Sequence, residues 1–319
     1  MRRVSILIAA IALDLAFGEP PNPVHPVAWL GRALGVGRRW LCRGSRRALL
    51  VRGAGVTLAV AAFAGTGGVL LHALGARLGA AGLALEAIAL ALLLSVRALI
   101  VAARRVATHL RRGDLPAARA SVGHDLVSRR TDALDPPRVA SAAVESVAEN
   151  LTDAFVAPAC FFLVFGLAGA AVYRAVNTAD AMLGYREGPL EHFGKVAARL
   201  DDALSFLPAR LAGWAVVVAS ALAGERARGA LAVMRRDRRR TASPNAGWTM
   251  AAMAGALGVT LEKPGAYRLG AGPLPDPEAI DRACRILALA VVVSGAAMVA
   301  GAVLLVHFFF VGARTGWVS

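Results

Sequence analysis

The sequence predicts an all-α, polytopic integral membrane protein with about five transmembrane or re-entrant helices and cytoplasmic helical loops. Apolar residues make up 57% of the 319 residues, more than the roughly 45–50% of soluble domains, and the mean hydropathy is +0.58. Several stretches approach the 20 or so apolar residues that span a bilayer. Since backbone polar groups in lipid must be bonded within the chain, these stretches are expected to be helices.

Four stretches have the length and composition of a membrane span, namely 54–74, 78–103, 154–172 and 286–311. Two others are shorter, 207–223 and 4–17. The 4–17 stretch follows two arginines, as in a signal peptide, but Asp14 interrupts it and no small-residue cleavage site follows. We expect a retained helix, within a single membrane-embedded domain (1–319) whose polar segments 104–153 and 225–285 are cytoplasmic.

The charge pattern favours a membrane partner. The net charge is +15, and all basic residues except Lys195 and Lys263 are arginines. The arginines gather in 32–52, 104–138 and 225–240, between apolar stretches. This pattern is typical of cytoplasmic loops that face lipid phosphates, so we expect the bilayer as partner and no nucleic acid. The three cysteines have no spacing typical of a zinc site or a disulfide framework.

The stretch 139–155 holds the most informative side chains. Glu145, Glu149 and Asp153 are spaced by four residues, which places them on one face of a helix, and Ser146 and Asn150 extend that face. Stacked acids destabilise a helix by roughly 0.2–0.5 kcal/mol per pair, whereas a bound cation reverses this. Oxygen ligands suit Mg²⁺ together with substrate phosphates. The alternative is a solvated acidic face neutralised by arginines.

The next polar segments offer further candidates. Asn177 and Asp180 are three residues apart and can face one site. His192, Lys195 and the pair Asp201-Asp202 follow, of which only one acid is expected to face the same ion. Capping and surface solvation explain each of these residues equally well when taken singly. The glycines around 188–194 do not have the spacing of a phosphate-binding loop.

Two loops complete the set. Asn245 and Trp248 lie in the run SPNAGW, before a stretch of small residues that suits either close helix packing or a broad, flat ligand. His25 lies among four prolines after the 4–17 stretch, and it is either a rigidly presented functional imidazole or a simple loop residue.

The order of these segments resembles the CobD/CbiB family of cobalamin biosynthesis, the adenosylcobinamide-phosphate synthases. The blocks that carry the resemblance are DLAFGEPPNPVHPVAWLG (14–31), ESVAENLTDAFVAP (145–158), NTADAMLGY (177–185), FGKVAARLDDALSFLPARL (193–211) and SPNAGW (243–248). His124, Ala181 and Thr249 depart from the family pattern, and the first puts the role of Asp125 in doubt.

The resemblance implies an enzyme that joins adenosylcobyric acid to 1-amino-2-propanol or its O-phosphate as an amide, with ATP and Mg²⁺, in the bacterial inner membrane. Other late enzymes of that pathway are possible partners. On this basis we expect Glu145, Glu149 and Asp153, with Asp180 or Asp201, to hold Mg²⁺ on the ATP phosphates. Asn150 and Asn177 are expected to orient ligands with their amides, and Lys195 with Arg199 or Arg210 to contact phosphate oxygens. His25 or His192 is the expected proton acceptor. Asn245 and Trp248 are expected to bind the ligands, with Trp248 lining the corrin. In a second hypothesis His25 is an axial cobalt ligand.

Because ATP is cytoplasmic, the acidic helix and the segment 174–206 should share one compartment. We therefore predict that 154–172 is re-entrant or packed among helices and does not cross the bilayer fully. Two other classes of function remain open. A corrinoid transporter would use the intramembrane charges Glu86 and Arg97, and a scaffold for corrinoid enzymes would need no catalytic acid.

Overall fold

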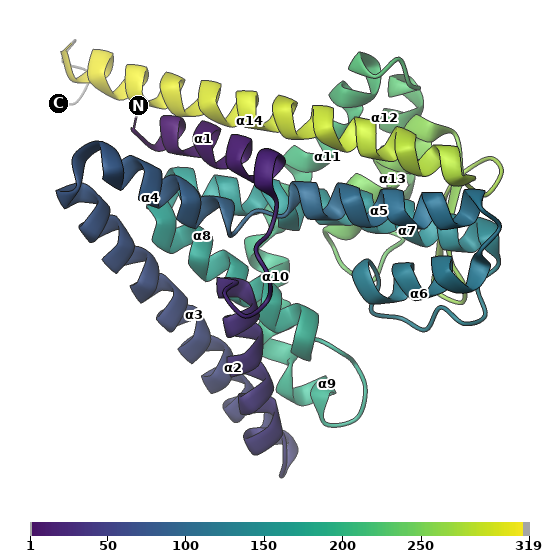
Figure 1. Ribbon diagram of the computed structural model, residues 1–319, viewed down its shortest axis with the longest axis horizontal. Coiled ribbons are helices and arrows are strands. Elements are labelled where there is room, and N and C mark those ends of the chain that lie inside the picture. The colour runs from purple at the N-terminus through teal and green to yellow at the C-terminus, as the bar shows by residue number, and fades with distance from the viewer. Residues whose placement is uncertain (1, 315–319) are drawn as a thin grey trace.

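The computed structural model describes residues 2–314, which are almost entirely helical (Figure 1). In chain order the first helices are α1 (Arg2–Phe17), α2 (Pro26–Leu41), α3 (Arg46–Arg77), α4 (Gly79–Ala91), α5 (Val96–Arg111), α6 (Leu115–Asp125), α7 (Pro136–Leu151), the π-helical turn η1 (Thr152–Val156) and α8 (Ala157–Leu183). They are followed by α9 (Leu190–Phe193), α10 (Lys195–Leu204), α11 (Phe206–Leu222), α12 (Ala227–Asp237), α13 (Ala246–Leu257) and α14 (Pro277–Arg314).

The predicted membrane class is confirmed by helix length and composition. Among residues 2–314, four helical stretches are long and apolar enough to cross a bilayer, namely Arg46–Arg77, Gly79–Arg111, Pro136–Leu183 and Pro277–Gly301. The pair Lys195–Leu204 and Phe206–Leu222, bent by 52°, is a fifth if it forms one span. Large apolar side chains such as Phe63, Leu70 and Val292 are exposed on these helices, as contact with lipid requires.

Strand structure, which the sequence did not predict, occurs once in the described part of the chain. Strands β1 (Thr260–Lys263) and β2 (Tyr267–Gly270) form an antiparallel hairpin in which Thr260 pairs with Gly270. The buried Asp237 carboxylate accepts a hydrogen bond of 2.8 Å from the Gly270 amide, which ties the hairpin to α12.

The chain reverses direction inside α8. Gly166 has φ 70° and ψ −162°, a conformation that glycine tolerates best. Beyond it the helix folds back, since the rings of Phe161 and Tyr173 stack at 5.4 Å, although twelve residues of continuous helix would span about 18 Å. Nη1 of Arg3 bonds the free carbonyls of Leu163 and Val164 at 2.8 and 2.9 Å. The segment 154–172 thus turns back on itself, as a re-entrant element does, and the prediction that it does not cross the bilayer fully stays a prediction.

The first helix is fixed at both ends by charged contacts. Asp14 accepts hydrogen bonds from the first amides of α5, of Val96 (3.1 Å) and Arg97 (3.2 Å). Arg97 in turn bonds the last carbonyls of α1, including that of Leu15 at 2.7 Å.

Near the other end of α1, Nη2 of Arg2 lies 2.6 Å from Oε1 of the buried Glu86, whose Oε2 is 3.0 Å from Nδ1 of His72. Glu86 and Arg97 are therefore each engaged with α1. These two charged residues do not line one polar pathway, so they no longer support a transporter function.

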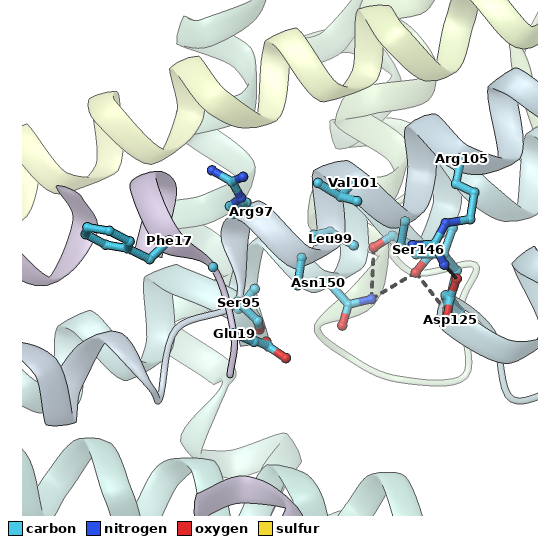
Figure 2. A pocket seen from close by; sticks show the side chains of 15 residues that line it. Phe17, Glu19, Ser95, Arg97, Leu99, Val101, Arg105, Asp125, Ser146 and Asn150 are labelled. Atoms are coloured by element: carbon cyan, nitrogen blue, oxygen red, sulfur yellow. Dashed lines mark hydrogen bonds and ion pairs between the residues drawn. The ribbon is translucent and has the colours of Figure 1, made fainter. Parts of the chain in front are cut away.

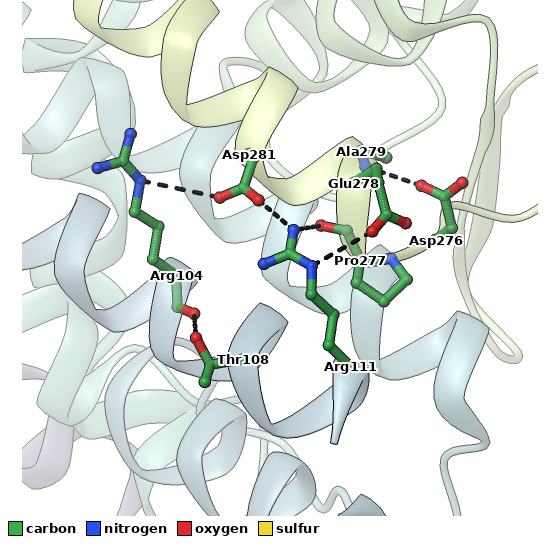
Figure 3. A network of polar contacts seen from close by, with 8 residues as sticks. All are labelled: Arg104, Thr108, Arg111, Asp276, Pro277, Glu278, Ala279 and Asp281. Carbon is green, nitrogen blue, oxygen red and sulfur yellow. Dashed lines mark hydrogen bonds and ion pairs between the residues drawn. The ribbon is translucent and has the colours of Figure 1, made fainter. Parts of the chain in front are cut away.

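An ion-pair network joins the end of α5 to the beginning of α14 (Figure 3). Nε of Arg111 lies 3.2 Å from Glu278, and its Nη2 contacts Asp281. Nε of Arg104 lies 3.8 Å from the same aspartate. These contacts set α5 and α14 side by side beyond their apolar parts, next to the helices that carry the candidate site.

Helix α7 lies in the centre of the molecule. Residues from Val139 to Ala148 are buried on all sides of the helix, whereas the sequence predicts a polar face along its length. Helix α13 is buried over almost its whole length and packs on α7, α11 and α12. Close packing is therefore the role of the small residues after Trp248, and the expectation that this stretch lines a flat ligand is wrong because protein covers it.

Candidate active site

Acidic side chains from α7, η1, α8 and α10 meet in one pocket of about 220 Å³ at the end of α7. The acids that line it are Glu149, Asp153, Asp180, Asp201 and Asp202. Asp153 and Asp180 would lie about 40 Å apart on a continuous helix. They share the pocket because the chain doubles back at Gly166, which places both ends of the hairpin at one site. We call this cavity the acidic pocket.

Asp153 is held from the returning arm of α8. The hydroxyl of the fully buried Tyr173 donates a hydrogen bond of 2.9 Å to Oδ1 of Asp153 and lies 3.0 Å from the hydroxyl of Ser205. Nη1 of Arg174 bonds the Asp153 carbonyl at 3.1 Å. The carboxylate is thus oriented on the π-helical turn before any ligand binds.

The two acids of α10 are positioned by amides and hydroxyls. The side-chain amide of Asn177 donates to Oδ1 of Asp201 at 3.2 Å. Ser243 donates to Oδ1 of Asp202 at 3.1 Å, and Asn245 donates to the Asp202 carbonyl at 2.8 Å.

Arg210 contacts the acids only indirectly, since it donates a hydrogen bond of 2.8 Å to Oδ1 of Asn245. Asn177 and Arg210 therefore support the acids without lining the pocket, whereas Asn245 lines the pocket, as expected of a ligand-binding residue, and also bonds Asp202. Asp202 lines the pocket together with Asp201, and the expectation that only one acid of the pair faces the ion stays a prediction.

The position of the Asp180 side chain requires a glycine at residue 184. A Cβ added at Gly184 would lie 2.0 Å from Oδ1 of Asp180 and 2.7 Å from its carbonyl oxygen. Beyond this glycine, Arg186 supplies the basic side chain at the pocket. The acids and this arginine give the cavity both cation ligands and an anion-binding group.

The lining of the acidic pocket supplies oxygen donors of the kind that bind Mg²⁺. Within residues 2–314, the side chains as placed form no group of three or more His, Cys, Asp or Glu that could hold a metal by itself. The donors that line the pocket are oxygen atoms, and Mg²⁺ commonly takes one or two carboxylates and completes its shell with water and phosphate oxygens. The donor chemistry of the lining residues therefore suits Mg²⁺.

Glu145 is separated from the other acids. Its carboxylate accepts hydrogen bonds from Ser141 (2.8 Å) and Tyr267 (2.7 Å) and lies 3.2 Å from Nη2 of Arg129. Burial raises the pKa of Tyr267 well above its usual range, and nearby Glu145 adds to this, so the phenol stays a donor. Glu145 fastens the β-hairpin to α7 and does not line the acidic pocket, contrary to the expected set of three.

Asn150 and Trp248 also lie elsewhere. Asn150 lines a second cavity beside α7. Successive residues of a helix are rotated by 100°, so the Asn150 side chain points to a different side of α7 from that of Glu149. Its amide donates to the Ser146 carbonyl at 2.9 Å. The ring of Trp248 lies under the guanidinium carbons of Arg210 (5.0 Å) and Arg238 (4.9 Å), so the structure gives it a cation–π role.

Several predicted residues are not brought to the acidic pocket. His192 lies in the short helix α9, and Lys195 and Arg199 are exposed on α10 without lining the pocket. His25 caps the start of α2, where its Nδ1 accepts the Val27 amide at 3.1 Å.

Sequence reasoning missed Arg186, Thr152 and Ser205, which line the pocket. Arg186 directly follows the block at 177–185, and that adjacency is the signal that could have found it.

Fold and site together define a multi-helical membrane protein with an oxygen-lined acidic pocket. The chain belongs to the CobD/CbiB family, since the family model described as CobD/Cbib protein matches residues 7–287. It is 42% identical to the cobalamin biosynthesis protein CobD of Dehalococcoides mccartyi over 85% of this chain and 87% of that protein. It is 40% identical to a CobD of Rhodobacter capsulatus, over 89% and 91%. No solved structure matches the chain.

Proposed function

We propose that this protein forms an amide between adenosylcobyric acid and 1-amino-2-propanol or its O-phosphate, with ATP, in cobalamin biosynthesis at the bacterial inner membrane. The names of the relatives support the pathway. The observation that carries the reaction class is the gathering of Glu149, Asp153, Asp180, Asp201 and Asp202 around one pocket. Such a set suits the phosphates of ATP with Mg²⁺.

A carboxylate does not react with an amine at neutral pH, because its carbonyl carbon is electron-rich and oxide is a poor leaving group. Transfer of the terminal phosphoryl group of ATP to the corrinoid carboxylate gives an acyl phosphate and ADP. Bound Mg²⁺ would neutralise the charge that develops on the phosphate oxygens.

Of this chain's residues, Glu149, Asp153, Asp180 and Asp201 hold the ion, and Arg186 contacts phosphate oxygens. This assignment replaces Lys195 and Arg199, which lie outside the pocket. Tyr173 and Asn177 act as positioning residues, since each bonds an acid of the pocket.

The test uses the full chain purified in detergent, incubated with adenosylcobyric acid, ATP, Mg²⁺ and each candidate amine. Amide product and released phosphate are detected by mass and by colorimetry. Glu149→Gln is expected to lower the rate at least 10²-fold. The matched control is Glu187→Gln, which makes the same chemical change in the exposed loop beside the pocket.

Glu149 is exposed within an acidic surrounding, so its neutralisation should not unfold the protein. An unchanged melting temperature together with lost turnover supports the proposal. Full turnover of Glu149→Gln would remove the acidic pocket from the reaction, whereas a wild-type chain that forms no amide by itself would favour a scaffold role.

A further inference from the structure

A second cavity of about 570 Å³ lies beside α7 and η1 (Figure 2). The loop after α1 contributes Glu19, the start of α5 contributes Ser95, and α7 contributes Ser146 and Asn150. Asn150 follows Glu149 of the acidic pocket directly in the chain. The two cavities therefore lie on neighbouring faces of the same helix.

The basic side chains of this cavity are already engaged. Arg97 bonds the last carbonyls of α1, and Arg105 lies 3.1 Å from Asp125. Of the two carboxylates that line the cavity, Asp125 is thus paired, whereas Glu19 has no arginine within 4.0 Å among the described residues. The amide nitrogen of Asn150 is bonded within α7, which leaves its oxygen toward the cavity. Two acceptors, the Glu19 carboxylate and the Asn150 side-chain oxygen, are thus available in the cavity to a ligand that donates hydrogen bonds.

His25 lies next to Glu19. Its Nδ1 accepts the Val27 amide, so the neutral ring carries its proton on Nε2. That nitrogen is buried, has no hydrogen-bond partner, and lies 3.8 Å from Oε2 of Glu19. This tautomer makes His25 a donor toward Glu19 and argues against His25 as the proton acceptor.

The charges that act on this pair come from Arg174. Burial raises the pKa of Glu19, and Arg174 partly offsets this. Burial lowers the pKa of His25, as does Arg174. The imidazole therefore stays neutral at pH 7, while the carboxylate is a stronger base than an exposed glutamate.

Arg174 also separates the two cavities. It bonds the carbonyl of Asp153, which lines the acidic pocket, and the hydroxyl of Ser95, which lines the second cavity, at 3.1 and 3.0 Å. Arg174 thus contacts a lining residue of each cavity, which places the two cavities on either side of one guanidinium group.

We propose that the second cavity binds the amine substrate, a primary alkylammonium, on the Glu19 carboxylate, with His25 as a positioning residue. The inference rests on the proposed amide formation. Glu19 takes one proton from the ammonium, which frees the nitrogen lone pair. The nitrogen bonds to the acyl carbon, the bond from that carbon to the phosphate oxygen breaks, and phosphate leaves with the electron pair and the second amine proton.

The test compares two nucleophiles on one activated acid. Hydroxylamine is largely unprotonated at neutral pH and needs neither a counter-charge nor a base, so it traps an acyl phosphate as a hydroxamate. Glu19→Gln is expected to lower amide formation with 1-amino-2-propanol about 10²-fold and to keep ATP-dependent hydroxamate formation within about twofold of wild type. Glu187→Gln again serves as the matched control.

Binding gives a readout without turnover. Isothermal titration of 1-amino-2-propanol into the wild-type chain should show saturable binding that Glu19→Gln abolishes. For the positioning role, His25→Gln keeps a side-chain donor and should retain more amide formation than His25→Ala, at equal hydroxamate formation.

Three outcomes overturn the inference. Equal loss of amide and hydroxamate in Glu19→Gln would make Glu19 structural. Retention of both products would place the amine elsewhere. A wild-type protein that forms neither product with ATP would remove the proposed reaction itself, which is distinguishable because the failure then precedes any substitution.

Discussion

Removal of one buried hydroxyl tests the position of Asp153. In Tyr173→Phe the ring that stacks on Phe161 is retained, but Oδ1 of Asp153 loses its donor at 2.9 Å and the buried Ser205 hydroxyl loses its partner at 3.0 Å. Each group left without its partner costs about 1–3 kcal/mol. The variant should therefore be destabilised by at least about 2 kcal/mol.

Thermal unfolding in detergent, followed by tryptophan fluorescence, measures this loss. At roughly 2–4 °C per kcal/mol, the Tm of Tyr173→Phe falls by at least about 4 °C. Tyr185→Phe is the matched control, because Tyr185 is 36% exposed. An unchanged Tm in Tyr173→Phe would refute the reasoning, since it would mean that the hydroxyl neither orients Asp153 nor satisfies Ser205.

Two further predictions concern packing and pH. Gly53→Ala places a Cβ 1.8 Å from the Phe193 carbonyl oxygen and should destabilise the protein by about 3 kcal/mol or prevent its recovery as a monodisperse species. In the control Gly55→Ala, the added Cβ meets nothing within 4 Å and should stabilise α3 by about 0.5–1 kcal/mol. Equal Tm values for the two variants would contradict the tight contact at Gly53. Hydrogen bonding to Arg282 lowers the pKa of Glu225, so its contribution is present above the unfolded pKa of about 4.3 and is lost as pH falls through the folded value. The Tm difference between wild type and Glu225→Gln should be largest at pH 7 and shrink as the pH falls below the unfolded pKa. A difference that grows on acidification would reverse the assigned sign.

Hydropathy predicted the helical membrane class because burial in lipid depends on composition over some 20 residues. The proposal that 154–172 turns back came from a compartment argument, and the structure supplies its cause in the positive φ of Gly166. The resemblance to the CobD/CbiB family is confirmed by the family model and the relatives.

Side-chain neighbours were harder to predict because they depend on contacts between distant parts of the chain. Spacing alone put Glu145 with Glu149, but Tyr267, on a hairpin 122 residues away, holds Glu145 apart. Asn150 faces the second cavity because the loop after α1 and helix α5 enclose that side of α7. No local sequence pattern predicts the contact of Glu145 with Tyr267 or the position of Asn150 at the second cavity.

The contacts of α1 have a consequence for the order of biogenesis. Its partners Glu86, Arg97 and the carbonyl of Val164 are all synthesised after it. Arg2 and Asp14 thus lack these partners until residue 97 has left the ribosome, and Arg3 lacks its carbonyl partners until residue 164 has followed. Docking of the first helix is a late event of assembly, although that helix is the first to be translated.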